Sequence, residues 1–171
     1  MTLIGISGKK KTGKTTIAEY IQSLYPDRVV IISFADSLKD EVCEAGGITR
    51  KFLEDNKDDF RLILQGWGTD FRRKHHGTDY WIRKYLSKML RLTNNAIVIS
   101  PDMRFVNEAE AVQGINGILW RVQNSVDSFD THISETSLDN WKEWDAIIDN
   151  NDSLETLKQT ITTLLKKQNI K

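Results

Sequence analysis

The chain alternates short apolar segments with longer stretches in which apolar residues recur at helical spacing. Five segments are short, apolar and rich in β-branched residues, as buried strands are: residues 3–6, 28–33, 96–100, 117–122 and 145–148. Between them, positions such as Ile17, Ile21 and Leu24 share one helical face. This alternation predicts an α/β fold with a five-stranded parallel sheet covered by helices, and a site at the carboxyl ends of its strands.

Turn and capping residues set the expected helix boundaries. Asp36 or Ser37 is suited to cap a helix that stops at Gly46-Gly47, and Thr78 to cap a helix from Asp79 to Leu92. A short helix should open at Met103 and end at Gly114. The last helix follows a turn at residues 150–153, and its core face should carry Leu154, Leu157, Ile161, Leu164 and Leu165.

Two polar segments interrupt this pattern. Residues 48–60 are charged, and we predict a mobile connection there. Residues 123–140 form a polar stretch longer than the roughly 12–15 residues of ordinary loops, which predicts a lid-like loop that closes over a site.

The helix expected from Asp58 has two distinct faces. Its core face should carry Phe60, Ile63, Leu64, Trp67 and Phe71. Its opposite face should carry Arg61, Gln65, Gly68 or Thr69, and Arg72. A solvated surface is the plain interpretation, but such a surface needs no glycine, which costs about 1 kcal/mol relative to alanine within a helix. We therefore favour a ligand-binding face.

The strongest motif lies between the first strand and the first helix. Residues 8–15 read Gly-Lys-Lys-Lys-Thr-Gly-Lys-Thr and fit the phosphate-binding P-loop, Gly-x-x-x-x-Gly-Lys-[Ser/Thr]. Gly8 and Gly13 permit backbone conformations in which successive N–H groups converge on an anion, and the following helix directs its positive end there. Lys14 is suited to reach the outer phosphates and Thr15 to ligate Mg²⁺.

Further candidates surround this loop. We interpret Lys10 and Lys11 as functional and Lys9 as a solvated charge. Asp102 follows a buried strand, where P-loop enzymes place a carboxylate near Mg²⁺. The residues that follow the five strands should gather at one edge of the sheet: Gly8, Asp36, Asp102, Arg121 and Asn150.

Composition limits the function classes. The chain of 171 residues suits one domain, and its 39% hydrophobic and 28% charged residues are typical of a soluble protein. Lys plus Arg and Asp plus Glu number 24 each, so no global basic excess points to nucleic acid. The single cysteine, Cys43, the absence of an apolar run near 20 residues, and a first strand directly after Met1 predict a cytoplasmic protein without membrane contact.

Several segments, in order, resemble the phage-type deoxynucleoside monophosphate kinases. They are the lysine-rich P-loop, residues 34–39 (Phe-Ala-Asp-Ser-Leu-Lys), residues 64–70 (Leu-Gln-Gly-Trp-Gly-Thr-Asp), residues 79–81 (Asp-Tyr-Trp), residues 97–110 around Asp102-Met103-Arg104-Phe105, and residues 131–135 (Thr-His-Ile-Ser-Glu). The P-loop is shared with many NTPases, whereas the later segments are more specific.

The resemblance implies a single P-loop kinase domain over residues 1–171, with a fold similar to that of nucleoside monophosphate kinases. Its core would span about 1–35, 94–122 and 144–171, and an acceptor-binding helical region about 36–93. The implied reaction is transfer of the γ-phosphate of ATP, with Mg²⁺, to a deoxynucleoside 5′-monophosphate. The implied partners are small nucleotides, and whether the chain forms a homodimer is left open.

The candidate residues follow from the motif and the resemblance together. Those for ATP are Gly8, Lys10, Lys11, Thr12, Gly13, Lys14, Thr15, Thr16 and Asn150. Those for the acceptor nucleotide are Asp36, Lys39, Arg61, Gln65, Thr69, Arg72, Tyr80, Trp81, Arg104, His132 and Glu135. The candidate catalytic residues are Lys10, Lys14, Arg72 and Asp102, and the metal ligands are Thr15 and Asp102.

Some alternatives stay open at this point. Tyr80 or Trp81 either stacks on the base or belongs to the core, and Asp36 either orients the acceptor or caps a helix. The family usually carries Arg-Pro after the fourth strand, where this chain has Gln123-Asn124 and its nearest arginine is Arg121. A kinase for another metabolite, such as phosphomevalonate, and a nucleotide-binding module without catalysis are the rival functions.

Overall fold

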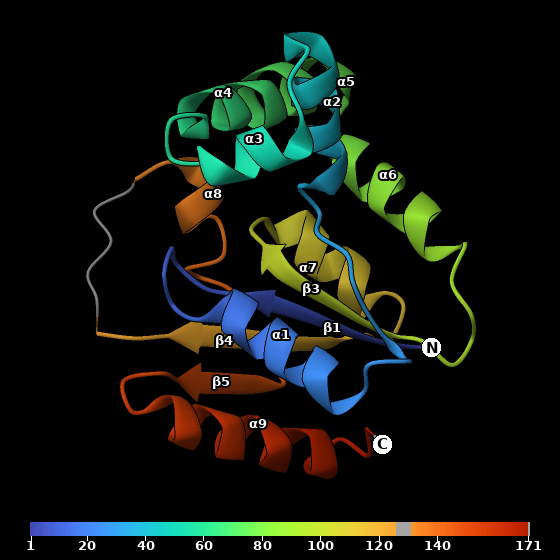
Figure 1. Cartoon of the computed structure of the whole chain (residues 1–171), viewed down its shortest axis with the longest axis vertical. Helices are drawn as coiled ribbons and strands as arrows, with labels where there is room; N and C mark the ends of the chain where they lie inside the picture. The colour runs from blue at the N-terminus through green and yellow to red at the C-terminus, as the bar shows by residue number, and fades with distance from the viewer. Residues whose placement is uncertain (126–130, 171) are drawn as a thin grey trace. The chain divides into compact units, whose positions relative to one another are not determined.

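The computed structural model describes residues 1–125 and 131–170 (Figure 1). The chain forms two compact units, one made of residues 1–33 with 93–171 and the other of residues 34–92.

The first unit is built on a parallel sheet. Its strands are β1 (Thr2–Ser7), β2 (Val29–Ile31), β3 (Ile97–Met103), β4 (Ile118–Gln123) and β5 (Ala146–Asp149). They lie in the order β2-β3-β1-β4-β5, and every neighbouring pair is parallel. The predicted fold class, a five-stranded parallel sheet with helices, is confirmed.

Successive residues of β1 face opposite sides of the sheet, and each side has its own helices (Figure 1). Ile4 and Ile6 are fully buried in a core shared with α1 (Lys14–Leu24) and α9 (Leu154–Lys167). On the other side lies α7 (Val106–Gln113), whose Val112 would be 3.4 Å from a Cβ placed at Gly5. Burial on both sides explains why the central strand β1 is apolar over most of its length.

The last helix matches its predicted cap but not all of its predicted core face. The Ser153 hydroxyl accepts a 3.2 Å hydrogen bond from the Thr156 N–H, as an N-cap should. Leu157, Ile161 and Leu165 are buried, whereas Leu154 in the first turn is 53% exposed, so its assignment to the core was wrong. Among the described residues, no helix combines the length and apolar character needed to cross a membrane.

Three boundaries in this unit differ from the prediction. Strand β3 continues through Asp102 to Met103, and α7 begins only at Val106, because Glu108 caps it. The predicted loop at 123–140 contains a short helix, α8 (Ile133–Thr136). Residues 126–130 of that predicted lid lie outside the described part of the chain.

The second unit is helical. It contains α2 (Asp36–Gly46), α3 (Arg50–Asp55), α4 (Arg61–Gln65), η1 (Gly66–Arg73), α5 (Lys74–His76) and α6 (Tyr80–Met89). Helix α3 replaces much of the mobile connection predicted at 48–60, since Thr49 caps it by accepting a 3.1 Å bond from the Phe52 N–H. Within the described residues, no side chain caps α2 or α6, so the capping roles predicted for Asp36, Ser37 and Thr78 were wrong.

The helix predicted from Asp58 changes its geometry halfway. Residues Gly66–Arg73 form a π-helix, whose i→i+5 hydrogen bonds widen each turn and rotate the following side chains away from α-helical positions. Ile63 and Phe71 are 50% and 45% exposed, so the core face predicted on α-helical spacing was wrong at these two residues.

Gly68 has a packing role in this segment. A Cβ there would lie 2.9 Å from Cδ2 of Leu38 on α2, and the Gly68 carbonyl accepts a 2.9 Å bond from Trp81 Nε1. The glycine therefore allows helices to approach closely, and this packing explains its presence without a ligand.

Candidate functional site

The P-loop leaves β1 after Ser7 and enters α1 at Lys14. Gly8 has φ +154°, and a Cβ there would lie 2.4 Å from the Val122 carbonyl oxygen. Gly13 has φ +98°, and its Cβ would lie 2.5 Å from Asn150 Nδ2. Both positions therefore require glycine. Asn150 Nδ2 donates a 2.9 Å bond to the Thr12 carbonyl, so Asn150 supports the loop from the end of β5.

Lys14 is the buried centre of this loop, with only 8% of its surface exposed. Its Nζ donates to the Lys9 carbonyl at 2.5 Å and to Thr12 Oγ1 at 3.3 Å. Burial, followed by the nearby charges of Arg104 and Arg121, lowers the Lys14 pKa to about 7, although Glu135 and Asp102 act in the opposite direction. In the unliganded site the protonated form of Lys14 is therefore unfavourable, and a bound anion would stabilise it.

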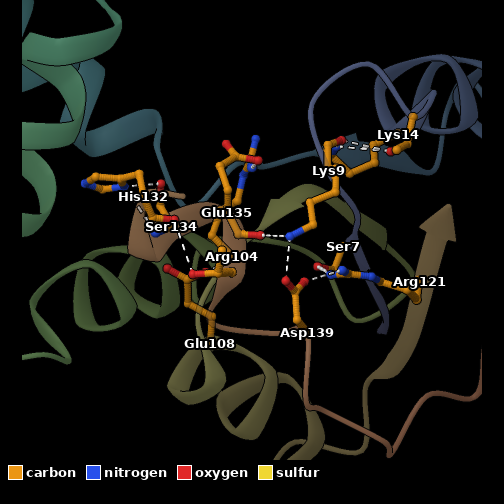
Figure 2. Close-up of polar contacts among 12 residues, drawn as sticks. Ser7, Lys9, Lys14, Arg104, Glu108, Arg121, His132, Ser134, Glu135 and Asp139 are labelled. Atoms are coloured by element: carbon orange, nitrogen blue, oxygen red, sulfur yellow. Dashed lines mark hydrogen bonds and ion pairs between the residues drawn. The ribbon is translucent and has the colours of Figure 1, made fainter. Parts of the chain in front are cut away.

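Arg104 reaches the Lys14 neighbourhood from the turn between β3 and α7. Its Nη1 forms an ion pair with the buried carboxylate of Glu135 (Figure 2). The backbone N–H groups of Arg104 and Phe105 donate to Glu108 Oε2 at 2.7 and 3.1 Å. Both acidic residues thus fix Arg104, and Glu135 acts on the predicted site through that arginine.

Arg121 lies at the end of β4, beside the start of the P-loop. Its Nη1 donates to Ser7 Oγ at 3.1 Å, and its Nη2 lies 2.9 Å from Asp139 Oδ1 (Figure 2). Its positive charge is one of the smaller causes that lower the pKa of Lys14. Gln123, at the last position of β4, is exposed.

Lys9 is tied to the segment around α8, so its interpretation as a solvated charge was wrong. Its Nζ donates to the Glu135 carbonyl and to Asp139 Oδ2, each at 2.6 Å (Figure 2). Asp139, which was not predicted as a site residue, binds both Lys9 and Arg121. Nothing in the local sequence indicates a contact across 130 residues.

His132 stabilises the start of α8. Its Nδ1 accepts a 3.1 Å bond from the Ser134 N–H and lies 2.7 Å from Ser134 Oγ. The His-x-Ser-Glu segment therefore forms a capped turn that presents Glu135 to Arg104 (Figure 2).

The remaining P-loop candidates lie at its surface. Lys11 is exposed and has φ +64°, Lys10 and Thr16 are half-buried, and Thr15 is exposed in the first turn of α1. The Asp102 carboxylate is close enough to influence Lys14 electrostatically. A hydroxyl and a carboxylate beside a phosphate-binding loop fit the oxygen-ligand preference of Mg²⁺.

In the helical unit, Arg72 on η1 is held by Glu41 on α2. Arg72 Nε donates to Glu41 Oε2 at 2.7 Å, and Tyr80 OH donates to Glu41 Oε1 at 2.6 Å. Trp81 is 3% exposed and belongs to the core, which settles its open alternative against base stacking. Arg73, the next residue of η1, is buried and donates to the Thr78 carbonyl at 2.8 Å.

Two other predicted residues join an ionic cluster in this unit. Asp36 Oδ1 accepts a 2.8 Å bond from Arg50 Nη2, and Lys39 Nζ donates to Glu54 Oε1 at 2.6 Å. Arg50 also contacts Glu54, at 3.2 Å. These pairs connect α2 to α3.

The rest of the polar stripe is half-buried: Arg61, Gln65 and Thr69. The side chains of Gln65 and Thr69 form no hydrogen bond with another described residue. Their amide and hydroxyl groups are therefore available to a ligand.

Comparison with solved structures identifies the fold. The structure is similar to shikimate kinase from Aquifex aeolicus vf5, with a TM-score of 0.54, 13% identity and 99% of each chain covered. Shikimate kinase from Bacteroides thetaiotaomicron gives a TM-score of 0.52 with 13% identity and 98% of each chain covered. At this identity the similarity concerns the P-loop kinase fold alone.

Comparison of sequences identifies the family. A family model described as deoxynucleotide monophosphate kinase matches residues 41–161, a range that begins after the P-loop. The chain is also 32% identical, over 91% of each sequence, to a protein of Acanthamoeba polyphaga mimivirus named "Putative deoxynucleotide monophosphate kinase". The chain therefore belongs to the deoxynucleotide monophosphate kinase family of phosphotransferases.

Proposed function

We propose that this protein transfers the γ-phosphoryl group of Mg²⁺-bound ATP to a deoxynucleoside 5′-monophosphate, giving ADP and the deoxynucleoside diphosphate. Family membership supports a nucleotide kinase. The observation that carries the donor assignment is Lys14, a buried lysine of the P-loop whose charge is disfavoured until an anion arrives.

The donor site would work mainly by neutralising charge. Phosphoryl transfer between two anions requires positioning and electrostatic stabilisation more than covalent chemistry by the protein. Lys14 would bind the outer phosphates together with the backbone N–H groups of residues 8–15. Arg104 and Arg121, whose charges already reach Lys14, would stabilise the negative charge of the moving phosphoryl group.

Thr15 and Asp102 would hold Mg²⁺. A bound Mg²⁺ would supply positive charge that offsets the charge of the phosphates. These residues fit that role because the Thr15 hydroxyl is exposed at the start of α1 and the Asp102 carboxylate lies within electrostatic reach of Lys14.

Arg72 would bind the acceptor phosphate. Arginine is purely a donor, and its planar fork suits the oxygens of a phosphate. Nε of Arg72 is used by Glu41 and Nη1 contacts His76, which leaves Nη2 without a partner among the described residues. Gln65 and Thr69 would supply further polar contacts to the nucleotide.

The family usually carries an arginine after the fourth strand, where this chain has Gln123. We infer that Arg121 supplies the positive charge that this family arginine would provide. Replacing Arg121 by Gln should lower kcat with little change in the KM for ATP. Adding Gln123→Arg to that variant should recover part of the lost kcat, because position 123 ends the same strand. An Arg121→Gln enzyme with unchanged kcat would refute the assignment.

The deciding experiment is an ADP-release screen with Mg·ATP. The acceptors are the deoxynucleoside monophosphates, the ribonucleoside monophosphates, phosphomevalonate and shikimate, with a reaction lacking acceptor as control. We expect the highest kcat/KM with a deoxynucleoside monophosphate. Preference for phosphomevalonate or shikimate, or tight ATP binding without ADP release for any acceptor, would overturn the proposal.

A further inference from the structure

Glu41 is the most highly connected carboxylate of the described helical unit. Its Oε2 accepts from Trp67 Nε1 at 3.1 Å and from Arg72 Nε at 2.7 Å. Its Oε1 accepts from Tyr80 OH at 2.6 Å and lies 3.2 Å from Lys84 Nζ. One side chain of α2 thus joins two residues of η1 to two residues of α6.

This carboxylate stays ionised throughout the neutral range. Only 14% of its side chain is exposed, and burial by itself would raise its pKa. Hydrogen bonds from Tyr80, Trp67, Arg72 and Lys84 outweigh burial and lower the Glu41 pKa to about 2. Because two cations contact one carboxylate, the cluster keeps an excess of positive charge that an anion can offset.

The Arg72 guanidinium is fixed on several sides. Its central carbon lies 5.1 Å from the Phe71 ring, 5.4 Å from the Tyr80 ring and 5.8 Å from the Trp67 ring. Its Nη1 lies 3.1 Å from His76 Nε2, which must accept because arginine only donates. A guanidinium held in this way loses little side-chain entropy when it binds a phosphate through the Nη2 edge.

We propose that Glu41 is a positioning residue for the acceptor phosphate: it holds Nε of Arg72 so that Nη2 of the guanidinium is directed to the ligand. This inference rests on the proposed function, because Arg72 is there the group that touches the acceptor. Glu41 itself makes no contact with substrate. A carboxylate that served stability alone would have no reason to affect acceptor binding more than ATP binding.

The test compares Glu41→Gln with Asp55→Asn. Asp55 is the control, since it is another ion-paired carboxylate of this unit, bonded to Lys51 and not to Arg72 or to a residue predicted to bind the acceptor. Loss of a hydrogen bond to a charged group is worth roughly 1.5–3 kcal/mol, which corresponds to a 10- to 100-fold change in binding. We therefore expect the KM for the deoxynucleoside monophosphate to rise roughly 10-fold or more in Glu41→Gln, and the KM for ATP to stay within about twofold.

A second measurement tests the contact between Glu41 and Arg72 in the absence of turnover. In the ¹⁵N NMR spectrum, the Arg72 Nε–H signal, assigned through its loss in Arg72→Lys, should be protected from exchange in the wild type and lose protection in Glu41→Gln. Circular dichroism establishes that each variant is folded. If Glu41→Gln does not fold, Glu41→Asp retains the charge on a shorter side chain and should give a smaller rise in the acceptor KM.

The outcomes separate the two proposals. A wild-type enzyme that turns over deoxynucleoside monophosphates, with an acceptor KM unchanged in folded Glu41→Gln or raised equally in Asp55→Asn, would overturn the positioning role alone. A wild-type enzyme without such turnover would overturn the proposed function. The NMR signal would then still report whether Glu41 holds Arg72.

Discussion

The Lys14 ammonium donates a 2.5 Å hydrogen bond to the carbonyl oxygen of Lys9, five residues earlier in the same loop. A carbonyl oxygen satisfies one N–H of the ammonium but does not neutralise its charge. Burial and two neighbouring arginines make this charge unfavourable and lower the Lys14 pKa to about 7. The lysine is thus arranged to exchange an internal contact for a phosphate.

Replacing Lys14 by Met should separate catalysis from stability. Loss of one preorganised charge at a transition state costs roughly 10²- to 10³-fold in kcat, so we expect at least that decrease. The melting temperature should not fall, because the variant also removes a buried amine. Steady-state kinetics and thermal melts measure both effects, with Lys51→Met, at an 83% exposed side chain, as the control. Full activity in Lys14→Met would refute the mechanism.

ATP binding should be coupled to proton uptake. At pH 8 most Lys14 side chains are neutral in the free protein, and a bound polyphosphate raises their pKa. We expect uptake of about one proton per ATP, measured by calorimetry in two buffers of different ionisation enthalpy. The uptake should disappear in Lys14→Met. Equal heats in the two buffers for the wild type would contradict this prediction.

The same pKa shift gives a signed dependence of stability on pH. Between about pH 7 and 10.5, Lys14 is protonated when unfolded and neutral when folded, so the unfolded state binds more protons. The free energy of unfolding of the wild type relative to Lys14→Met should therefore rise with pH through this window. Denaturant titrations at pH 7 and pH 9.5 measure it, and a constant difference would show that Lys14 is not perturbed.

Gly13→Ala should destabilise the P-loop for two separable reasons. The left-handed backbone costs a non-glycine residue about 1–2 kcal/mol, and the new Cβ would lie 2.5 Å from Asn150 Nδ2. Denaturant titrations should show a smaller loss when Gly13→Ala is introduced into an Asn150→Ala background. Equal losses in the two backgrounds would mean that the close approach of Asn150 contributes nothing.

Replacement by alanine should have opposite effects on stability at the two glycines of η1, Gly66 and Gly68. Gly68→Ala should cost about 1–3 kcal/mol through overpacking against Leu38, and Leu38→Ala should relieve part of this cost. Gly66 has φ −62° and ψ −47°, and a Cβ added there would meet no described atom within 4 Å, so Gly66→Ala should be neutral or stabilise by about 0.5–1 kcal/mol. Chemical denaturation measures both. A neutral Gly68→Ala would contradict the packing role.

The sequence by itself determined the sheet and the phosphate loop. Apolar runs and helical spacing are local properties, so β1 to β5 could be located as short apolar, β-branched segments before the fold was known. The P-loop was equally predictable because Gly8 and Gly13 are required by backbone geometry within a few residues.

The tertiary structure alone decided how the charges are held. Lys9 meets Asp139 across 130 residues and Arg72 meets Glu41 across 31, and no spacing rule indicates either pair. The switch to π-helical bonding in η1 redirects side chains without any mark in the apolar pattern, which is why Phe71 was misplaced. Such contacts depend on how distant elements pack together, whereas sequence periodicity reports only the local backbone.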